Sequence, residues 1–434
     1  METTVVNGLY TIKFDMIQAA ALGVFIYYVG VWIRNSFPIL VKLSVPAPAI
    51  GGLPVAFLVA FLQSYQILGV QFDGTLQNVL MVMFFCTVGM NASYKLLLKG
   101  GLMIAAFWLV ASVVAILQNV LGISIASVFG LDPLMGIIAG SVTMIGGLGT
   151  AGAFGPEFEK WGVEGAATAA IACATFGMVA GSLLGGPLAE WILKFHNVPT
   201  PKSGIQENPG DKQLTKEISD EIGYHEEVAM MAEEQAPALH LEEEESLVSG
   251  PHLMKNLAFV LIAMGFGAAI SLYLKQAGIT LPGYLGAMIA AVIIRNIGDL
   301  SKAYEVDSKA IGIISDISLA IFVTMAINSL KLWQLIDLAV PLLVMVLAQC
   351  IFLLLAAYFL VYWLFGRDYD AVVMAAGLMG FGLGATPNAL VNMQAVSSKY
   401  GYAAKAFFVV PIVGAFLIDF TNASAITIMA SFFR

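Results

Sequence analysis

Two glycine-rich stretches, each followed at once by hydroxyl or amide side chains, are the segments whose residue types fit the binding of a small solute. The first reads IGGLGT over residues 145–150, and the second reads GFGLGATPN over residues 380–388. Glycine permits a tight reversal and a close approach of backbones, and Pro387 lacks an N–H, which suits the first turn of a new helix. Each stretch therefore predicts a helix, a break and a second helix.

The second helix of each stretch would present free N–H groups and a positive dipole end, which attract a carboxylate. Carbonyls freed at the break, together with hydroxyl groups, would bind Na+ or another hard cation. The alternative is that these glycines only allow helices to pack closely in a bilayer. The predicted substrate-binding residues are Gly147, Gly149, Thr150, Gly382, Gly384, Thr386, Pro387, Asn388, Asp419 and Asn422.

Asp419 lies near the middle of the apolar run VVPIVGAFLIDFTNASAITIM. A charge in the middle of a membrane helix costs about 2.5–3.5 kcal/mol on insertion scales, so this carboxylate should face other helices and have a partner. Asn422 follows three residues later, on the same helical face. We predict that Asp419 binds Na+ or a substrate ammonium; a hydrogen bond between packed helices is the alternative.

Other polar residues inside apolar segments form the remaining candidates. A threonine and an asparagine one helical turn apart occur twice, and they suit either a polar lining or helix-end caps. Gln118, Asn119 and Gln349 are expected to make hydrogen bonds between helices. The predicted Na+ ligands are Thr87, Asn91, Thr324, Asn328, Gly384 and Asp419, and no other metal site is expected.

The elements that hold these residues must be membrane helices. Hydrophobic residues make up 59% of the 434 residues and charged residues only 11%, against roughly 25% in soluble domains. The composition indicates an integral membrane protein and excludes a soluble enzyme, a secreted disulfide scaffold and a nucleic-acid binder. An intramembrane hydrolase is also disfavoured, because all four histidines lie in or beside one acidic segment. The protein is therefore not expected to be an enzyme.

Ten apolar stretches are long enough, at roughly 20 residues, to cross a bilayer. The two glycine-rich stretches, at about residues 131–160 and 370–400, each precede the last helix of their half. The predicted crossings begin near Met16, Pro46, Leu76, Gly101, Gly165, Leu257, Leu281, Ala310, Leu335 and Tyr402.

Similar features recur in the same order at a shift of 237 residues, as when TVGMN is followed by TMAIN and IGGLGT by GFGLGAT. Five crossings in each half force the two halves to be inverted relative to one another. The expected fold class is all-α integral membrane, with two inverted-topology repeats of five transmembrane helices, each with a Gly-rich re-entrant hairpin. The expected division is residues 1–195, an acidic linker at residues 196–252, and residues 253–434.

Basic residues, which are retained on the cytoplasmic side, set the orientation. With the N-terminus outside, fifteen of the twenty lysines and arginines face the cytoplasm. Both termini are then periplasmic, and the linker, with thirteen acidic against three basic side chains, is cytoplasmic. No cleaved signal peptide is expected, because the N-terminal residues lack a basic segment before the first apolar run.

Inverted repeats with interrupted helices at matching positions are typical of secondary transporters. An anion channel of similar architecture is the alternative from another class; flux without saturation or counterflow would favour it. A carrier of organic acids is the alternative among transporters.

The sequence resembles the bacterial sodium/glutamate symporters over nearly its whole length outside the acidic linker. The resemblance rests on several runs, which are VPAPAIGGLPVAF, FFCTVGMNA, LDPLMGIIAGS, ACATFGMVAGSLLGGP, LKLW, GFGLGATPNALVNMQ and VVPIVGAFLIDFTNA. It implies Na+-coupled glutamate uptake across a bacterial inner membrane, with Na+ as coupling ion and no organic cofactor. It also implies a homodimer and an elevator-type movement of a transport domain against a fixed scaffold.

One departure from the family pattern concerns the first glycine-rich stretch. The family usually has SGGHGT there, whereas this sequence has Ile145 and Leu148 in place of the serine and the histidine. Alkyl groups thus replace a hydroxyl and an imidazole at a position expected to touch the substrate or its path. Another amino acid or an organic dicarboxylate is therefore kept as the alternative substrate.

Overall fold

The structure is a computed structural model that describes residues 2–6, 9–43, 45–201, 249–276, 283–335 and 338–433. Most of the acidic linker, residues 202–248, lies outside the described residues.

The first half of the chain forms long helices separated by short connections. Their bounds are α1 (Met16–Ser36), α2 (Pro38–Lys42), α3 (Ala47–Ser64), α4 (Thr75–Asn91), α5 (Tyr94–Val128), α6 (Pro133–Ile137), the π-helix η1 (Ile138–Val142), α7 (Gly147–Lys160) and α8 (Ala166–His196).

The second half is also built of helices separated by short connections. Their bounds are α11 (Gly250–Gln276), α12 (Gly283–Ser301), α13 (Ser308–Asn328), the 3-10 helix η3 (Leu332–Leu335), α14 (Ala339–Ala356), the π-helix η4 (Ala357–Tyr362), α15 (Tyr369–Leu383), α16 (Thr386–Tyr400), α17 (Ala404–Ile412), the π-helix η5 (Val413–Leu417) and α18 (Ile418–Ser431).

Eight of these helices are long and apolar enough to cross a membrane. The other two predicted crossings are also helical, but α4 has only 17 residues, and η5 divides the last helix. The predicted starting points agree with the observed ones to within a few residues, except that α5 and α11 begin one to two turns earlier. In α5 the cause is a kink at Gly101, whose backbone is not helical.

Aspartates occupy the N-cap positions of several helices, so these acidic side chains lie at helix ends and not within the apolar segments. Asp15 Oδ1 accepts hydrogen bonds from the backbone N–H groups of Ile17 and Gln18, both at 2.9 Å. Asp307 does the same for Lys309 N at 2.8 Å. An aspartate at this position satisfies orphan N–H groups and interacts favourably with the helix dipole.

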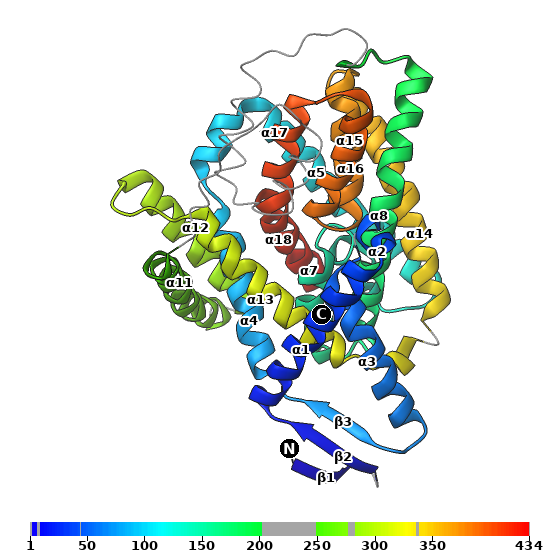
Figure 1. Cartoon of the computed structure of the whole chain (residues 1–434), viewed down its shortest axis with the longest axis vertical. Coiled ribbons are helices and arrows are strands. Elements are labelled where there is room, and N and C mark those ends of the chain that lie inside the picture. Colours follow the sequence, from blue (N-terminus) through cyan, green and yellow to red (C-terminus); the bar gives the residue numbers. More distant parts are fainter. Residues whose placement is uncertain are drawn as a thin grey trace.

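A small three-stranded sheet departs from the all-α expectation. It contains β1 (Glu2–Val6), β2 (Leu9–Phe14) and β3 (Gly69–Phe72), with β1 antiparallel and β3 parallel to β2. The sheet projects from the end of the molecule that carries the N-terminus (Figure 1). It caps the ends of α1 and α3 and contributes nothing to the helical core.

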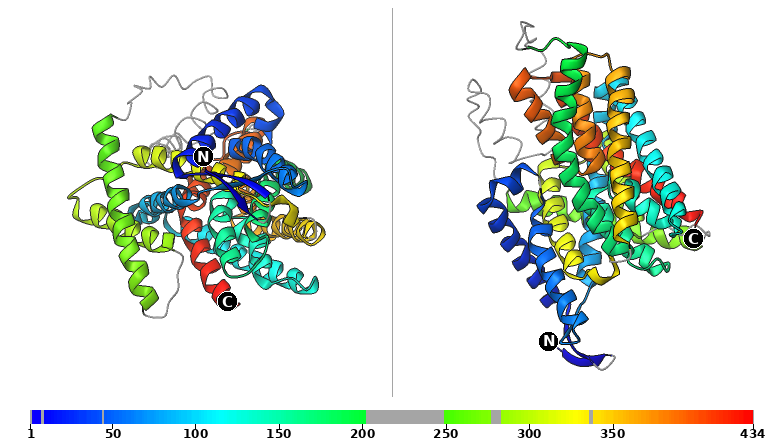
Figure 2. Two further views of the ribbon diagram at one scale, coloured as in Figure 1. Left: turned by 90° about the horizontal axis from the view of Figure 1, so that it is seen from below. Right: turned by 90° about the vertical axis from the view of Figure 1, so that its right-hand side faces the viewer.

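The helices pack into two units, and each unit draws on both halves of the chain. We call α1, α3, α4, α11, α12 and α13 the peripheral unit, and α5 to α8 with α14 to α18 the hairpin unit, because packing is most extensive within these groups. The two units lie side by side, with α11 and α14 on opposite sides of the molecule (Figures 1 and 2). The largest buried apolar cluster lies mainly in the hairpin unit, and a second lies in the peripheral unit.

The outer faces of the helices are apolar, as a lipid-facing surface requires. On α14, Val340, Leu343, Leu347, Ile351 and Leu355 form an exposed stripe along the whole helix. A soluble protein rarely exposes such a continuous apolar surface.

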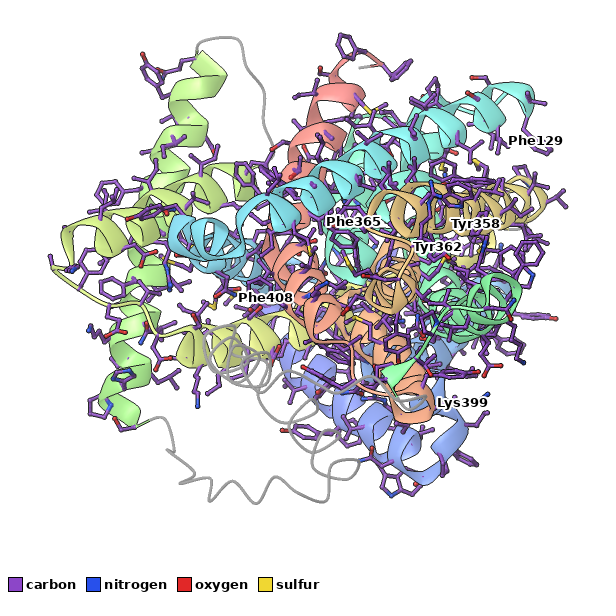
Figure 3. The ribbon with its side chains drawn as sticks, turned by 90° about the horizontal axis from the view of Figure 1, so that it is seen from above. Phe129, Tyr358, Tyr362, Phe365, Lys399 and Phe408 are labelled. Carbon is purple, nitrogen blue, oxygen red and sulfur yellow. The ribbon has the colours of Figure 1, made fainter. Side chains whose placement is uncertain are left out.

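Aromatic side chains gather at one end of this surface, where η4 meets the end of α8. Tyr358 and Tyr362 stack with ring centroids 6.0 Å apart (Figure 3), and the Tyr358 hydroxyl lies 2.9 Å from His196 Nε2. Such amphipathic rings are typical of the boundary between hydrocarbon and headgroups.

Packing of α11 on α12 depends on the absence of a side chain at Gly267. A Cβ atom built at this position lies 2.2 Å from the Cα of Ala287. We expect Gly267→Leu to lower the free energy of unfolding by about 1–3 kcal/mol, as overpacking does. The melting temperature of the purified protein in detergent, followed by tryptophan fluorescence, measures the change.

Gly265→Leu provides the matched control, because nothing lies within 4 Å of a Cβ at that exposed position of the same helix. Equal melting temperatures for the two variants would contradict the close contact between α11 and α12.

Candidate functional site

The first glycine-rich stretch forms two helical segments joined by a turn. Asp132 begins α6 by accepting a hydrogen bond from Leu134 N at 2.8 Å. The helix loses its regular form at Gly140 in η1 (φ −92°, ψ −134°). After a turn at residues 143–146, α7 begins at Gly147, whose φ of +57° favours glycine.

The second stretch has the same plan. Asp368 begins α15 by accepting a hydrogen bond from Ala371 N at 2.9 Å. Gly384 (φ −154°, ψ −94°) and the extended residue Ala385 interrupt the helix. A new helix, α16, begins at Thr386 with Pro387 in its first turn, as the sequence predicted.

The two breaks touch each other. A Cβ atom built at Gly147 lies 2.5 Å from the carbonyl oxygen of Gly384, so the backbones meet where no side chain fits. The neighbouring helix α8 also approaches closely, because a Cβ atom at Gly177 lies 2.4 Å from the carbonyl oxygen of Leu383. The breaks of segments more than 200 residues apart in sequence thus form one junction, which we call the tip junction.

Side-chain amides on surrounding helices bind the backbone groups that the breaks release. Gln118 Nε2 donates to the carbonyl of Gly382 at 2.9 Å. Asn119 Oδ1 accepts from Ser141 N at 2.8 Å, and Asn422 Nδ2 donates to the carbonyl of Ser141 at 3.0 Å. Buried backbone groups outside regular helix require such partners.

Residues of α16 anchor the second break in the same manner. Thr386 Oγ1 donates to the carbonyl of Gly414 in η5 at 2.6 Å. Asn388 Nδ2 donates to the carbonyl of Met178 in α8 at 2.8 Å. The last helix therefore contacts both hairpins, through Gly414 and through Asn422.

Several oxygen atoms around the tip junction are buried, yet have no hydrogen-bond partner among the described residues. Native proteins rarely leave such groups unsatisfied, and oxygen is the ligand that hard cations prefer. These atoms are Gln118 Oε1, Ser141 Oγ, Gln349 Oε1, Asn388 Oδ1 and Asn422 Oδ1. They fit the chemistry of Na+ coordination.

Asp419 lies in the first turn of α18, between the positions that contact the two hairpins. The helix-packing hydrogen bond, which was the alternative role for this residue, is not formed: within the described part of the chain, Asp419 has neither a hydrogen bond nor an ion pair. Its side chain is partly buried. A carboxylate in this position is available for a cation or a ligand.

The predicted threonine and asparagine pairs lie in the peripheral unit, on α4 and α13. Thr87 Oγ1 donates to the carbonyl of Phe84 at 2.6 Å, and Thr324 Oγ1 donates to the carbonyl of Ala320 at 2.7 Å. Both hydroxyls thus bind their own helices. The Oδ1 atoms of Asn91 and Asn328 are buried without a described partner.

The remaining predicted residues lie along the two hairpins. Thr150 is buried one turn into α7, close to Gly146. Gly149 packs against Phe84 of α4, whose ring lies 2.8 Å from a Cβ atom built at the glycine. Pro387 is exposed.

Ser141 was not among the predicted site residues, and the amides of Gln118, Asn119 and Gln349 were predicted only to bond helix to helix. Gln349 Nε2 donates to the carbonyl of Gln118 at 2.7 Å, which confirms the expected bond between helices. The bonds from Gln118 and Asn119 to the hairpins were not predicted. The signal available in the sequence was a pair of adjacent amides inside an apolar helix, because such residues in lipid need partners.

Gly147→Ala tests the contact at the tip junction. A left-handed backbone conformation costs an L-residue about 1–2 kcal/mol, and the contact with Gly384 adds the cost of overpacking. Gly130→Ala is the control, because Gly130 has φ +68° and nothing within 4 Å of a built Cβ atom. We expect a larger loss of unfolding free energy at Gly147, measured by thermal unfolding in detergent; equal losses would refute the contact.

The chain is similar to known proteins over most of its length. The family model described as sodium/glutamate symporter matches residues 12–402. The sodium/glutamate symporter of Escherichia coli (strain K12) is 37% identical over 394 residues, which cover 90% of this chain and 91% of that protein. The sodium/glutamate symporter of Haemophilus influenzae is 34% identical over 416 residues, covering 96% and 97% respectively.

Among solved structures, the sodium proton antiporter MjNhaP1 from Methanocaldococcus jannaschii is similar with a TM-score of 0.42 and 14% identity, covering 96% of this chain and 98% of that one. The extent and identity of the matches to the symporters, over a multi-pass helical fold, determine the family. This chain belongs to the sodium/glutamate symporter family.

Proposed function

We propose that this protein takes up L-glutamate together with Na+ across a bacterial inner membrane. The observation that carries the proposal is the tip junction, where two helix N-termini and several unpartnered buried oxygens lie together. The proposal adds Asp419, which lies in sequence between the two positions of the last helix that bind the hairpins. The relatives of this chain are named sodium/glutamate symporters.

The tip junction has the complementary groups for an acidic amino acid and a cation. The first turns of α7 and α16 offer N–H groups and positive dipole ends to carboxylates. Asp419 and Asn422 would hold the substrate ammonium or a Na+ ion. The oxygens of Ser141, Asn388 and Gln118 supply further ligands for Na+, and no organic cofactor is required.

We further propose that the two hairpins are re-entrant and enter from opposite faces of the membrane, within two inverted five-helix repeats. Both termini are periplasmic in this arrangement, and the acidic linker is cytoplasmic. Support comes from the matching order of elements in the two halves and from the distribution of basic residues. The functional assembly is a homodimer.

An elevator-type movement fits the two packing units. The hairpin unit carries the whole tip junction and would move against the peripheral unit. Glycines form part of the boundary between them, since Gly149 faces Phe84 and Gly152 faces Phe322. A helix face without side chains can slide past aromatic rings with little interlocking.

The ion gradient is sufficient to drive accumulation. A tenfold Na+ gradient supplies about 1.4 kcal/mol per ion, and 100 mV adds about 2.3 kcal/mol per net charge moved. Coupling to two or more Na+ ions would therefore concentrate glutamate many-fold.

Counterflow of labelled glutamate in proteoliposomes tests the proposal. We expect exchange that requires Na+ on the side where glutamate binds, because cation and carboxylates share one site. Exchange at the full rate without Na+ would exclude the proposed coupling, and linear flux without saturation would indicate a channel.

Asp419→Asn removes the charge while keeping the side-chain size. We expect Na+-driven uptake to fall by at least about tenfold, because a charged ligand of the cation or the ammonium is lost. Asp73→Asn, in the loop before α4, is the control and should transport normally, because Asp73 is exposed and its carboxylate accepts hydrogen bonds from Thr75 at the start of that helix. An unchanged rate in Asp419→Asn would refute its assigned role.

A different substrate is the second candidate, and Leu148 favours it. This side chain lies in the first turn of α7, beside the tip junction, and is 7% exposed. It replaces the histidine that the family usually has there, so the site is less polar than the family pattern. Competition by unlabelled amino acids and dicarboxylates against labelled glutamate identifies the preferred substrate.

A further inference from the structure

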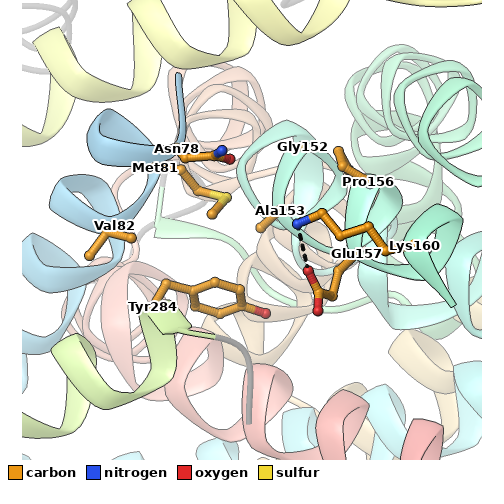
Figure 4. A pocket seen from close by; sticks show the side chains of 9 residues that line it. All are labelled: Asn78, Met81, Val82, Gly152, Ala153, Pro156, Glu157, Lys160 and Tyr284. Atoms are coloured by element: carbon orange, nitrogen blue, oxygen red, sulfur yellow. Dashed lines mark hydrogen bonds and ion pairs between the residues drawn. The ribbon is translucent and has the colours of Figure 1, made fainter. Parts of the chain in front are cut away.

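A second polar space lies away from the tip junction, at the boundary of the two units. It is a cavity of about 150 Å³ between α4, α7 and α12. Asn78 and Tyr284 line it from the peripheral unit, and Glu157 and Lys160 line it from the hairpin unit (Figure 4). A space of this size suits a small metabolite.

The most informative group in this cavity is the hydroxyl of Tyr284. The side chain is 2% exposed, and its hydroxyl oxygen is buried without a hydrogen-bond partner among the described residues. Its ring is held by Phe85, with centroids 4.4 Å apart, and by Phe154, at 5.5 Å. A buried tyrosine hydroxyl normally finds a partner, so this one is available to a ligand in the cavity.

Charges of both signs face the same space. Lys160 Nζ and Glu157 Oε2 lie 3.1 Å apart, with 67% and 29% of their side chains exposed. An exposed pair of this kind is worth little by itself, so exchanging it for contacts with a ligand costs little. The Asn78 amide faces the opposite wall of the cavity (Figure 4).

We propose that this cavity, which we call the outer pocket, is a second binding site for the zwitterionic head of an amino acid. The α-carboxylate would accept hydrogen bonds from Lys160 Nζ and the Tyr284 hydroxyl, and the ammonium would bind Glu157 and the Asn78 carbonyl. The inference rests on the proposed function in taking the transported amino acid as the ligand, which arrives from the side where α7 ends.

Two aromatic rings separate the outer pocket from the tip junction. Along α7, Gly147 lies at the tip junction, and the pocket lining extends from Gly152 to Lys160. Phe84 packs on Gly149 and Phe322 packs on Gly152, and their ring centroids are 5.8 Å apart. An amino acid in the outer pocket is therefore held before the aromatic pair, and it contacts both units at once.

Binding of labelled glutamate to the purified full-length Asp419→Asn protein tests this site, because that variant lacks the carboxylate of the tip junction. We expect a residual glutamate site that does not require Na+. Adding Tyr284→Phe or Lys160→Gln should weaken it about tenfold or more, as loss of a hydrogen bond to a charged group does. Lys331→Gln, an exposed lysine outside the pocket, is the control and should leave the affinity unchanged.

The chemistry of the ligand is tested by competition at the same site. Unlabelled glutamate should displace the label, and succinate, which lacks the ammonium that Glu157 would bind, should not. Equal displacement by succinate, absence of the residual site, or indifference of the site to both pocket variants would overturn the inference. If wild-type uptake requires Na+ and the binding assay finds no second site, only this inference is overturned. If wild-type uptake proceeds without Na+, the result counts against the proposed function.

Discussion

The constraint on which this structure depends is that backbone groups released from a helix inside an apolar body must bind something else. At the tip junction the hairpins release such groups, and the amides of Gln118, Asn119 and Asn422 bind them. Each of these amides uses one end for the backbone. The oxygens of Gln118 and Asn422 have no hydrogen-bond partner among the described residues, so under the proposed function the groups that stabilise the breaks would also supply oxygens to a ligand.

Much of the helical plan was predictable because its signals are local. The lengths of the apolar stretches predicted the helices, and Gly384 with Pro387 predicted the second helix break. The three-stranded sheet was missed, since β3 joins β2 from more than 50 residues away. The all-α fold class holds for the membrane helices, and the sheet is a small addition at the end that carries the N-terminus. The contact of Gly147 with Gly384 and the roles of Gln118 and Asn119 depend on long-range packing, which no local pattern reveals.

The division into two packing units also comes from long-range packing. The first three long helices of each half join in the peripheral unit, and the remaining helices of each half, with both hairpins, join in the hairpin unit. The repeat in the sequence predicts two halves that follow one another along the chain. In the folded protein, each packing unit contains helices from both halves. The result places the tip junction in one unit and the two aromatic rings that pack on α7, Phe84 and Phe322, in the other.

The position of bound glutamate tests most directly whether the tip junction is the substrate site. A cryo-electron microscopy map of the purified protein with saturating Na+ and glutamate would provide it. The account predicts ligand density in contact with the first turns of α7 and α16, beside Asp419 and Asn422, whether or not the outer pocket is also occupied. Density confined to the outer pocket, or to a place remote from both hairpins, would contradict it.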